Sequence, residues 1–348
     1  MAKQSGNKDV RKLQLTGGAT YTLSLPKIWV KHHNLKSRDG IQVDWRPSGA
    51  LRLTPFNTIE QIKKITLSTR KIPEGALLDH LMGAYLSGTD RIKINFTSKE
   101  NSKIKKIIRI FQRSTRGFEI EEELDESITL ITLINAGELP MRSSLNQMYM
   151  QLNSLIRDIL DVISGEDKSL IEDYEERERE IDSLRFFIER QAGIVLDSYK
   201  VAERLNIGRR QAVEYSNLAR ALERMADHTN QMAHLVLEDN GQTKLSFDTP
   251  PLNQIPIWQG ALRTLMINIR TNNAEEIEAA RNSLKSAQKI LKQHERSLWS
   301  GRKDANKLLF EDHISESIRR LCAYTRDFGE ILLNILTYDC IIFDKRNN

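Results

Sequence analysis

Hydrophobic and polar residues alternate with a period of two at the start of the chain. Apolar side chains fall on odd positions there, which is the pattern of a half-buried β-strand, and Gly17-Gly18 supplies a turn. Pro26 opens a short helix over residues 27–34. The strands are expected over residues 12–18, 19–25, 41–45 and 50–53. Such short elements give one chain too little core, so we expect an intertwined dimer.

The next part, residues 56–140, alternates between strand and helix patterns. The expected order is βαβαββ, with a hairpin around Asp125-Glu126. The strands are expected over 64–70, 91–96, 118–122 and 127–134, and the helices over 73–86 and 101–113. No catalytic spacing occurs in this part, which we interpret as a small α+β connector.

From residue 141 onward the pattern is helical, with one break at residues 247–251 and Pro256. The helices are expected over 144–164, 169–197, 208–238, 257–271, 274–299 and 306–337. Residues 218–227 align with residues 318–327, which indicates a duplicated three-helix unit.

Composition narrows the class of protein. The chain has 348 residues, of which 39% are hydrophobic, 28% charged and 6% aromatic, as in a helix-rich soluble protein. Its longest apolar runs are too short to span a bilayer, and its first residues do not resemble a secretory signal. Cys322 and Cys340 fit a reducing interior. We therefore expect a cytoplasmic protein.

The net charge of +5 is unevenly distributed. Residues 1–55 hold ten Lys and Arg against three Asp and Glu, whereas residues 141–348 hold twenty-nine against thirty-two. A basic arm over residues 1–8 leads into Arg11-Lys12. Such an excess in so short a segment is typical of nucleic-acid binding, although basic residues that protect edge strands are the alternative.

Two acidic pairs with the same spacing, Glu178 with Asp182 and Glu223 with Asp227, occur in the first helical repeat. Residues four apart share a helix face, where like charges repel unless something neutralises them. Antiparallel packing would bring four carboxylates together, a donor set suited to iron, manganese or magnesium, with His228 as an additional candidate ligand. Periodicity alone favours a solvated surface or ion pairs instead. The arginines that would form those pairs are Arg185, Arg190, Arg220 and Arg224.

Within the first segment, residues 11–18, 23–29, 35–40 and 49–55 resemble a SpoVT/AbrB-like domain. The resemblance implies a swapped-hairpin dimer that binds DNA. Arg38-Asp39-Gly40 departs from the family's usual order of Gly then Asp. The DNA contacts that the resemblance implies fall on Arg11, Lys12, Lys27, Lys31 and Arg38.

The helical part resembles the PhoU family in residues 178–191 and 222–228, which carry that family's two acidic ExxxD motifs. The resemblance implies one metal ion, iron, manganese, zinc, nickel or magnesium, at a single carboxylate site. That site would be formed by Glu178, Asp182, Glu223 and Asp227. The second repeat keeps only Asp327 of the motif, because Ala323 stands where Glu223 stands in the first.

Together the resemblances describe an archaeal-type two-part regulator that is mainly α. The expected domains are a β domain over 1–55, the connector over 56–140, and a pair of three-helix bundles over 141–348, with repeats at about 141–245 and 252–345. The expected function is a DNA-binding transcriptional regulator of phosphate uptake that is not an enzyme. Its helical part would sense metal, phosphate or a transporter partner. The alternative is a signalling adaptor of a phosphate transport system that does not bind DNA; a bundle-type metalloenzyme has little support.

Overall fold

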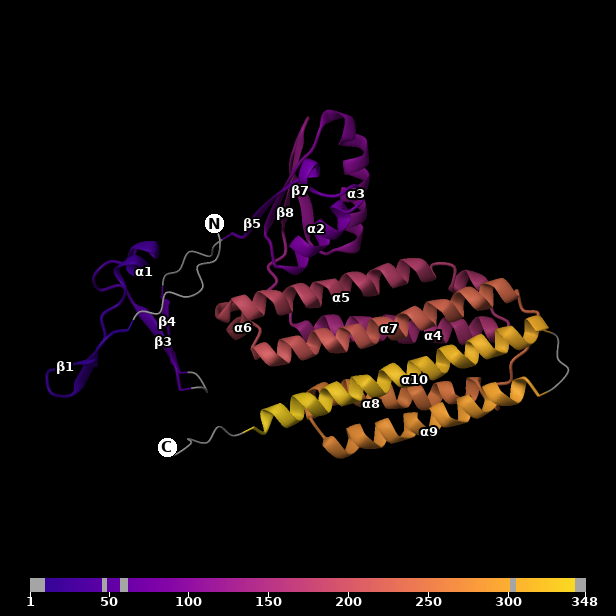
Figure 1. The fold of residues 1–348 in the computed structure, drawn as a ribbon. Helices are drawn as coiled ribbons and strands as arrows, with labels where there is room; N and C mark the ends of the chain where they lie inside the picture. Colours follow the sequence, from indigo (N-terminus) through magenta and orange to yellow (C-terminus); the bar gives the residue numbers. More distant parts are fainter. Residues whose placement is uncertain (1–9, 46–48, 57–61, 301–304, 342–348) are drawn as a thin grey trace. The chain divides into compact units, whose positions relative to one another are not determined.

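The computed structural model describes residues 10–45, 49–56, 62–300 and 305–341. By its internal contacts the chain divides into two units, residues 1–61 with 342–348, and residues 62–341 (Figure 1). The basic arm expected over residues 1–8 lies outside the described residues.

The described residues of unit 1 form two separate hairpins and one short helix. Strand β1 (Gln14–Thr16) pairs with β2 (Thr20–Thr22), and β3 (Ile41–Trp45) pairs with β4 (Leu51–Pro55), both antiparallel. Helix α1 spans Lys27–His32. The expected hairpins and helix are therefore present within one chain, but the swapped-hairpin dimer fold is not confirmed.

The described part of unit 1 has almost no core. Many of its large apolar side chains are exposed, such as Tyr21 at 70% and Trp45 at 82%, others are half-buried, and only Pro55 is buried. The alternation of apolar positions therefore forms strand faces that the described part of the chain covers only in part. Such hairpins are marginal by themselves in water.

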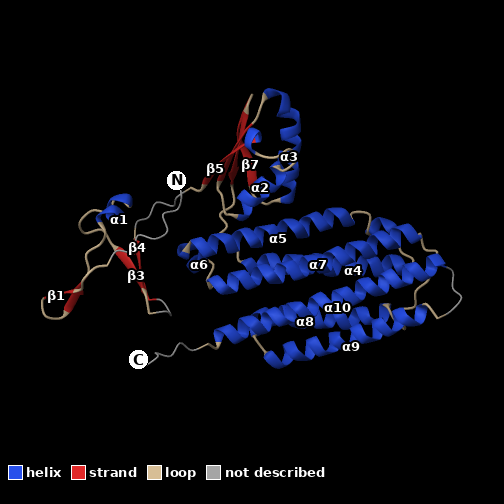
Figure 2. Ribbon diagram, in the orientation of Figure 1, coloured by secondary structure: helices blue, strands red, loops and turns tan. Residues whose placement is uncertain are grey.

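The connector forms a four-stranded sheet with two helices. Its strand order is β5-β6-β8-β7, in which β5 and β6 are parallel and the other pairs antiparallel. The strands are β5 (Lys64–Ser68), β6 (Arg91–Asn95), β7 (Phe118–Leu124) and β8 (Ser127–Thr132), and the helices α2 (Leu77–Leu86) and α3 (Asn101–Ser114). The predicted βαβαββ order is confirmed. Leu81, Phe111 and Ile94 belong to one buried core. Helices α2 and α3 lie beside the strands of the sheet (Figure 2).

Two predicted boundaries in the connector are wrong. Helix α2 begins at Leu77 rather than at Pro73. Gly75 has φ +87°, a left-handed conformation that ends any helical run begun at Pro73. The first strand ends at Ser68, and residues Thr69–Lys71 form a 3₁₀ turn, η1. A second 3₁₀ turn, η2 (Ser98–Glu100), leads into α3.

Six long helices form the rest of unit 2. The first three are α4 (Met141–Ser164), α5 (Tyr174–Asp197) and α7 (Arg209–Asp239), and the second three are α8 (Ile255–Thr271), α9 (Ala274–Leu298) and α10 (Ala305–Asp339). Buried residues of both sets, such as Leu152 and Leu284, belong to one continuous core. The main contact between the sets is α7 against α10 (Figure 1). None of the described helices is long and apolar enough to cross a membrane.

Differences from the predicted helix boundaries are local. The 3₁₀ turn η3 (Lys168–Leu170) precedes α5, so the second helix starts at Tyr174. A short helix that the periodicity did not predict, α6 (Tyr199–Arg204), is capped by Ser198, whose hydroxyl accepts the Val201 N–H. Pro256 lies in the first turn of α8, directly after η4 (Leu252–Gln254), where a proline is tolerated, so it does not break the pattern.

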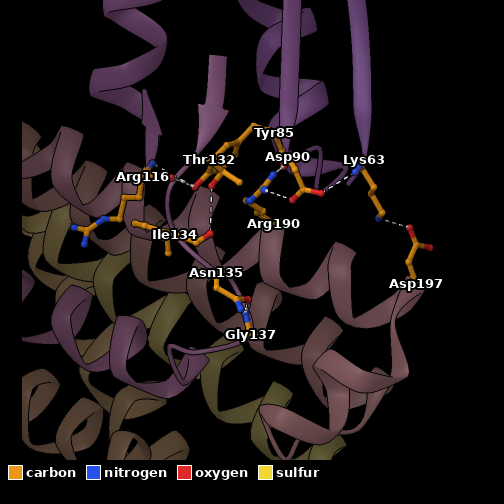
Figure 3. A network of polar contacts seen from close by, with 10 residues as sticks. All are labelled: Lys63, Tyr85, Asp90, Arg116, Thr132, Ile134, Asn135, Gly137, Arg190 and Asp197. Atoms are coloured by element: carbon orange, nitrogen blue, oxygen red, sulfur yellow. Dashed lines mark hydrogen bonds and ion pairs between the residues drawn. The ribbon is translucent and has the colours of Figure 1, made fainter. Parts of the chain in front are cut away.

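The connector contacts α5 through a buried arginine. Arg190 is 1% exposed, and its Nη1 donates to the Tyr85 carbonyl oxygen at 2.7 Å while Nη2 lies 3.8 Å from Asp90 Oδ1. Asp90 Oδ2 accepts the Lys63 backbone N–H at 2.8 Å, and Lys63 Nζ pairs with Asp197 Oδ2 at 2.9 Å (Figure 3). The polar groups at this interface therefore join the connector directly to the helix that carries Glu178 and Asp182.

Candidate functional site

The four predicted carboxylates lie on two adjacent helices. Glu178 and Asp182 are one turn apart on α5, and Glu223 and Asp227 are one turn apart on α7, which packs along α5. Glu178, Asp182 and Glu223 are half-buried, and Asp227 is exposed at the edge of the cluster. The structure therefore brings the four predicted residues into one region.

Each of the four carboxyl groups has a raised pKa. Loss of water contact is the largest cause in every case, and it raises the pKa of Glu223 to about 6. The charges of Asp227 and Asp182 raise the pKa of Glu178 further, and that of Asp182 also raises the pKa of Asp227. Burial therefore disfavours the charged form of all four groups, and repulsion between neighbouring carboxylates adds to this at Glu178, Glu223 and Asp227.

One arginine lies between the two acidic pairs. Arg185 Nε is 3.3 Å from Glu223 Oε1 and 3.8 Å from Asp182 Oδ1, and Nη1 is 3.3 Å from Glu189 Oε1. Although it is near these acids, the buried Nε donates no hydrogen bond. The guanidinium therefore shares its charge among several carboxylates without satisfying any one of them fully.

The other arginines considered as neutralising partners are placed differently. Arg190 contacts the connector, and Arg220 pairs with Glu189 at 2.7 Å. Arg224 lies over the Tyr324 ring and only lowers the pKa of Glu223 and Asp227 from a distance. Of the four, only Arg185 forms ion pairs with the predicted carboxylates.

Among the described residues, no three His, Cys, Asp or Glu side chains are arranged to hold a metal ion. The Arg185 guanidinium lies within ion-pair distance of both Glu223 and Asp182. His228 stacks on Tyr324 at 5.7 Å, and burial lowers its pKa, so its ring is engaged with α10.

Asn230 is a residue that the sequence analysis missed. It is 5% exposed and lies one turn after Asp227 on α7. Its side chain interacts with Glu178 and lowers the pKa of that carboxyl, against the effects of burial and of the neighbouring acids. Asn230 is therefore a positioning residue of the cluster. The sequence held one signal for Asn230: it lies three residues after Asp227, on the same face of the helix.

The second repeat presents other side chains at the corresponding positions. Arg281 pairs with Glu278 at 2.8 Å and lies 3.8 Å from Glu330. Burial raises the pKa of Asp327, and Glu330 raises it further, while the nearby arginines lower it.

The predicted DNA-binding residues are all on the surface of unit 1. Lys27 and Lys31 are one turn apart on α1. Arg38 has φ +78°, and the turn around it is held by Asp39, whose Oδ2 accepts the Lys36 N–H at 2.7 Å. The unusual Arg-Asp-Gly order therefore still forms a turn. All five predicted residues are exposed: Arg11, Lys12, Lys27, Lys31 and Arg38.

Comparison with known proteins identifies one domain. A family model described as PhoU domain matches residues 145–236, which include α5, α7 and all four carboxylates. No curated protein sequence matches the chain.

Two solved structures are similar to part of the chain. One is the phosphate transport system regulatory protein PhoU from Streptococcus pneumoniae, at 17% identity and a TM-score of 0.46, over 58% of this chain and 95% of that one. The other is PhoU from Pseudomonas aeruginosa, at 15% identity and a TM-score of 0.47, over 57% and 96%.

Proposed function

We propose that this chain is a regulatory protein of phosphate transport that acts by binding partner proteins rather than by catalysis. The observation that carries the proposal is the PhoU domain match over residues 145–236, because the matched helices contain the clustered carboxylates. This adaptor role needs no chemistry at the cluster beyond binding.

The experiment is phosphate uptake in cells that lack the gene and are complemented with variants. Wild-type chain should restore regulated uptake, low in phosphate-rich medium and high after phosphate limitation. Glu178→Ala/Asp227→Ala should fail to restore the regulation although the protein accumulates normally. Uptake that is indistinguishable with and without the gene would refute the adaptor role.

We also propose that the carboxylate cluster binds one metal ion: iron, manganese, zinc, nickel or magnesium. Two observations support the proposal: the raised pKa values of the four carboxyl groups and the single arginine that they share. Glu178, Asp182, Glu223 and Asp227 would supply oxygen ligands, and the cation would compensate charge that Arg185 balances only in part. Metal analysis of wild type beside Glu223→Ala and Asp227→Ala should show metal loss in the variants.

A second candidate function is DNA binding by unit 1. It is supported by the exposed basic residues, since apolar strand faces that pair two chains would double the positive charge on one surface. Affinity for promoter DNA should then fall steeply between 50 and 200 mM salt and weaken in Arg11→Ala/Lys12→Ala. If affinity does not change with salt concentration, or if no binding is seen, the DNA-binding proposal is refuted and the adaptor role remains.

A further inference from the structure

A groove with strongly positive lining lies between α4 and α8, away from the carboxylate cluster. It has a volume of about 370 Å³, in the size range of small-molecule sites. Helix α4 belongs to the first repeat and α8 to the second, so the groove exists only where the two repeats meet. The lining residues that matter here are Arg142, Asn146 and Tyr149 of α4, and Arg263, Met266 and Arg270 of α8.

The groove concentrates hydrogen-bond donors that have no acceptor. Among the described residues, no ion pair or hydrogen bond engages the guanidinium groups of Arg142, Arg263 and Arg270. The side-chain amide of Asn146 and the Tyr149 hydroxyl likewise have no recorded partner in the described chain. Elsewhere in unit 2, arginines such as Arg177 and Arg319 pair with carboxylates within 3 Å. These three arginines are exposed to solvent, and their guanidinium groups around one groove would attract an anion.

The position of Arg142 supports this interpretation. It lies in the first turn of α4, a turn that holds no acidic residue. A cation is unfavourable at the positive end of the helix dipole. An anion bound in the groove would interact favourably with both the side chain and the helix terminus.

The spacing of the groups indicates an elongated ligand. Arg142 and Tyr149 are seven residues apart, as are Arg263 and Arg270, which places the members of each pair about 10 Å apart along a helix. Arg263 lies close enough to Tyr149 to lower the pKa of that phenol against the effect of burial. Positive charge is therefore distributed along the groove rather than focused at one point.

We propose that this groove binds a small anion that carries at least two phosphoryl groups. Each planar guanidinium matches two phosphate oxygens, and separate arginines would hold separate phosphoryl groups. Buried Met266 and the half-buried Tyr149 ring add an apolar surface beside the charges. The proposal is independent of the regulatory function and of the cation site.

The test is calorimetric titration of the full chain with pyrophosphate and with ADP, which separates a free diphosphate from one attached to a nucleoside. Both should bind wild type at moderate salt. The variant Arg142→Gln/Arg263→Gln should bind at least about tenfold more weakly, since charged hydrogen bonds to phosphate are strong. Arg296→Gln, which removes an exposed and unpaired arginine of α9, is the matched control and should bind as wild type does. Circular dichroism melting shows that each variant is folded.

Three results would overturn the proposal. They are no heat of binding for either diphosphate, equal binding by wild type and Arg142→Gln/Arg263→Gln, and equally tight binding of orthophosphate or of sulfate at matched ionic strength. The last would show accumulation of counterions instead of recognition of linked phosphoryl groups.

Discussion

Thr325 Oγ1 lies 3.3 Å from the Met225 sulfur, although 100 residues separate them in the sequence. The two residues hold equivalent positions in α7 and α10, so the contact lies where the two repeats meet. The same hydroxyl accepts the Trp258 indole N–H at 2.8 Å and donates to the Leu321 carbonyl oxygen at 2.8 Å. One buried hydroxyl thus connects α8 and α10 next to α7.

Thr325→Val should destabilise unit 2 because it leaves the buried Trp258 N–H without an acceptor. The expected loss is about 1–3 kcal/mol in free energy of unfolding, measured by urea denaturation. Thr229→Val is a matched control, since Thr229 is also fully buried and donates to the carbonyl four residues back, Met225 O, but accepts from no indole. Equal losses in the two variants would mean that the indole bond contributes nothing.

The raised pKa of Glu223 predicts that stability falls as pH rises. A carboxyl that is easier to protonate in the folded state stabilises that state in acid. This contribution is complete below about pH 4.5, the ordinary value, and is lost as pH rises through about 6. At 1.36 kcal/mol per unit, the loss by pH 7 is about 2 kcal/mol.

Glu223→Gln should therefore stabilise the metal-free protein at pH 7 and flatten its stability profile between pH 4.5 and 7. Urea denaturation in the presence of a chelator measures both effects. Glu172→Gln replaces an exposed acid outside the cluster and serves as the control. An unchanged slope in Glu223→Gln would show that this carboxyl is not perturbed.

Arg185→Gln separates the two interpretations of the carboxylate cluster. If the cluster binds a cation, removing the competing guanidinium should raise affinity for Mn²⁺ by about tenfold, equivalent to 1.4 kcal/mol. Asp227→Asn and Asn230→Ala should weaken the affinity. Arg220→Gln, which removes an exposed arginine paired with Glu189, should change little.

Calorimetric titration with Mn²⁺ gives these affinities directly. If the cluster only forms ion pairs, Arg185→Gln will be destabilised, and neither it nor wild type will take up the ion.

The contact between the connector and α5 leaves no space at Gly193. A Cβ there would lie 2.7 Å from the Leu86 carbonyl oxygen of α2. Gly193→Ala should therefore loosen this interface and speed amide hydrogen exchange in α2, with exchange measured by mass spectrometry. Gly83→Ala is the control: it lies in α2 with no atom within 4 Å of a new Cβ and should stabilise the helix by about 0.5–1 kcal/mol. Slower exchange in Gly193→Ala would contradict the prediction.

The helices and the connector could be predicted because each depends on local periodicity. Ile181, Leu184 and Ile188, which are three or four residues apart on α5, are all buried, and the predicted offset of 100 residues between the repeats matches the contact between Met225 and Thr325. The boundaries that were wrong depend on single backbone conformations, such as the positive φ of Gly75. Those conformations leave no trace in a hydrophobic pattern.

The site was only partly predictable for a different reason. The spacing of four within each acidic pair indicated the carboxylates, but the role of Arg185 depends on how α5 packs against α7. No sequence pattern indicates the arginine groove, because Arg142 and Arg263 come from different repeats. Their proximity is a property of the folded chain.

The exposed hairpins of unit 1 link the folding of this unit to the concentration of the chain. Since Tyr21 and Trp45 are largely exposed in a single chain, little of the free energy needed to order these strands comes from within it. Any stabilisation supplied by a second chain follows mass action, so the folded fraction of this unit rises with protein concentration. The order of the basic unit would then depend on the abundance of the chain, whereas the helical unit has its own buried core within a single chain.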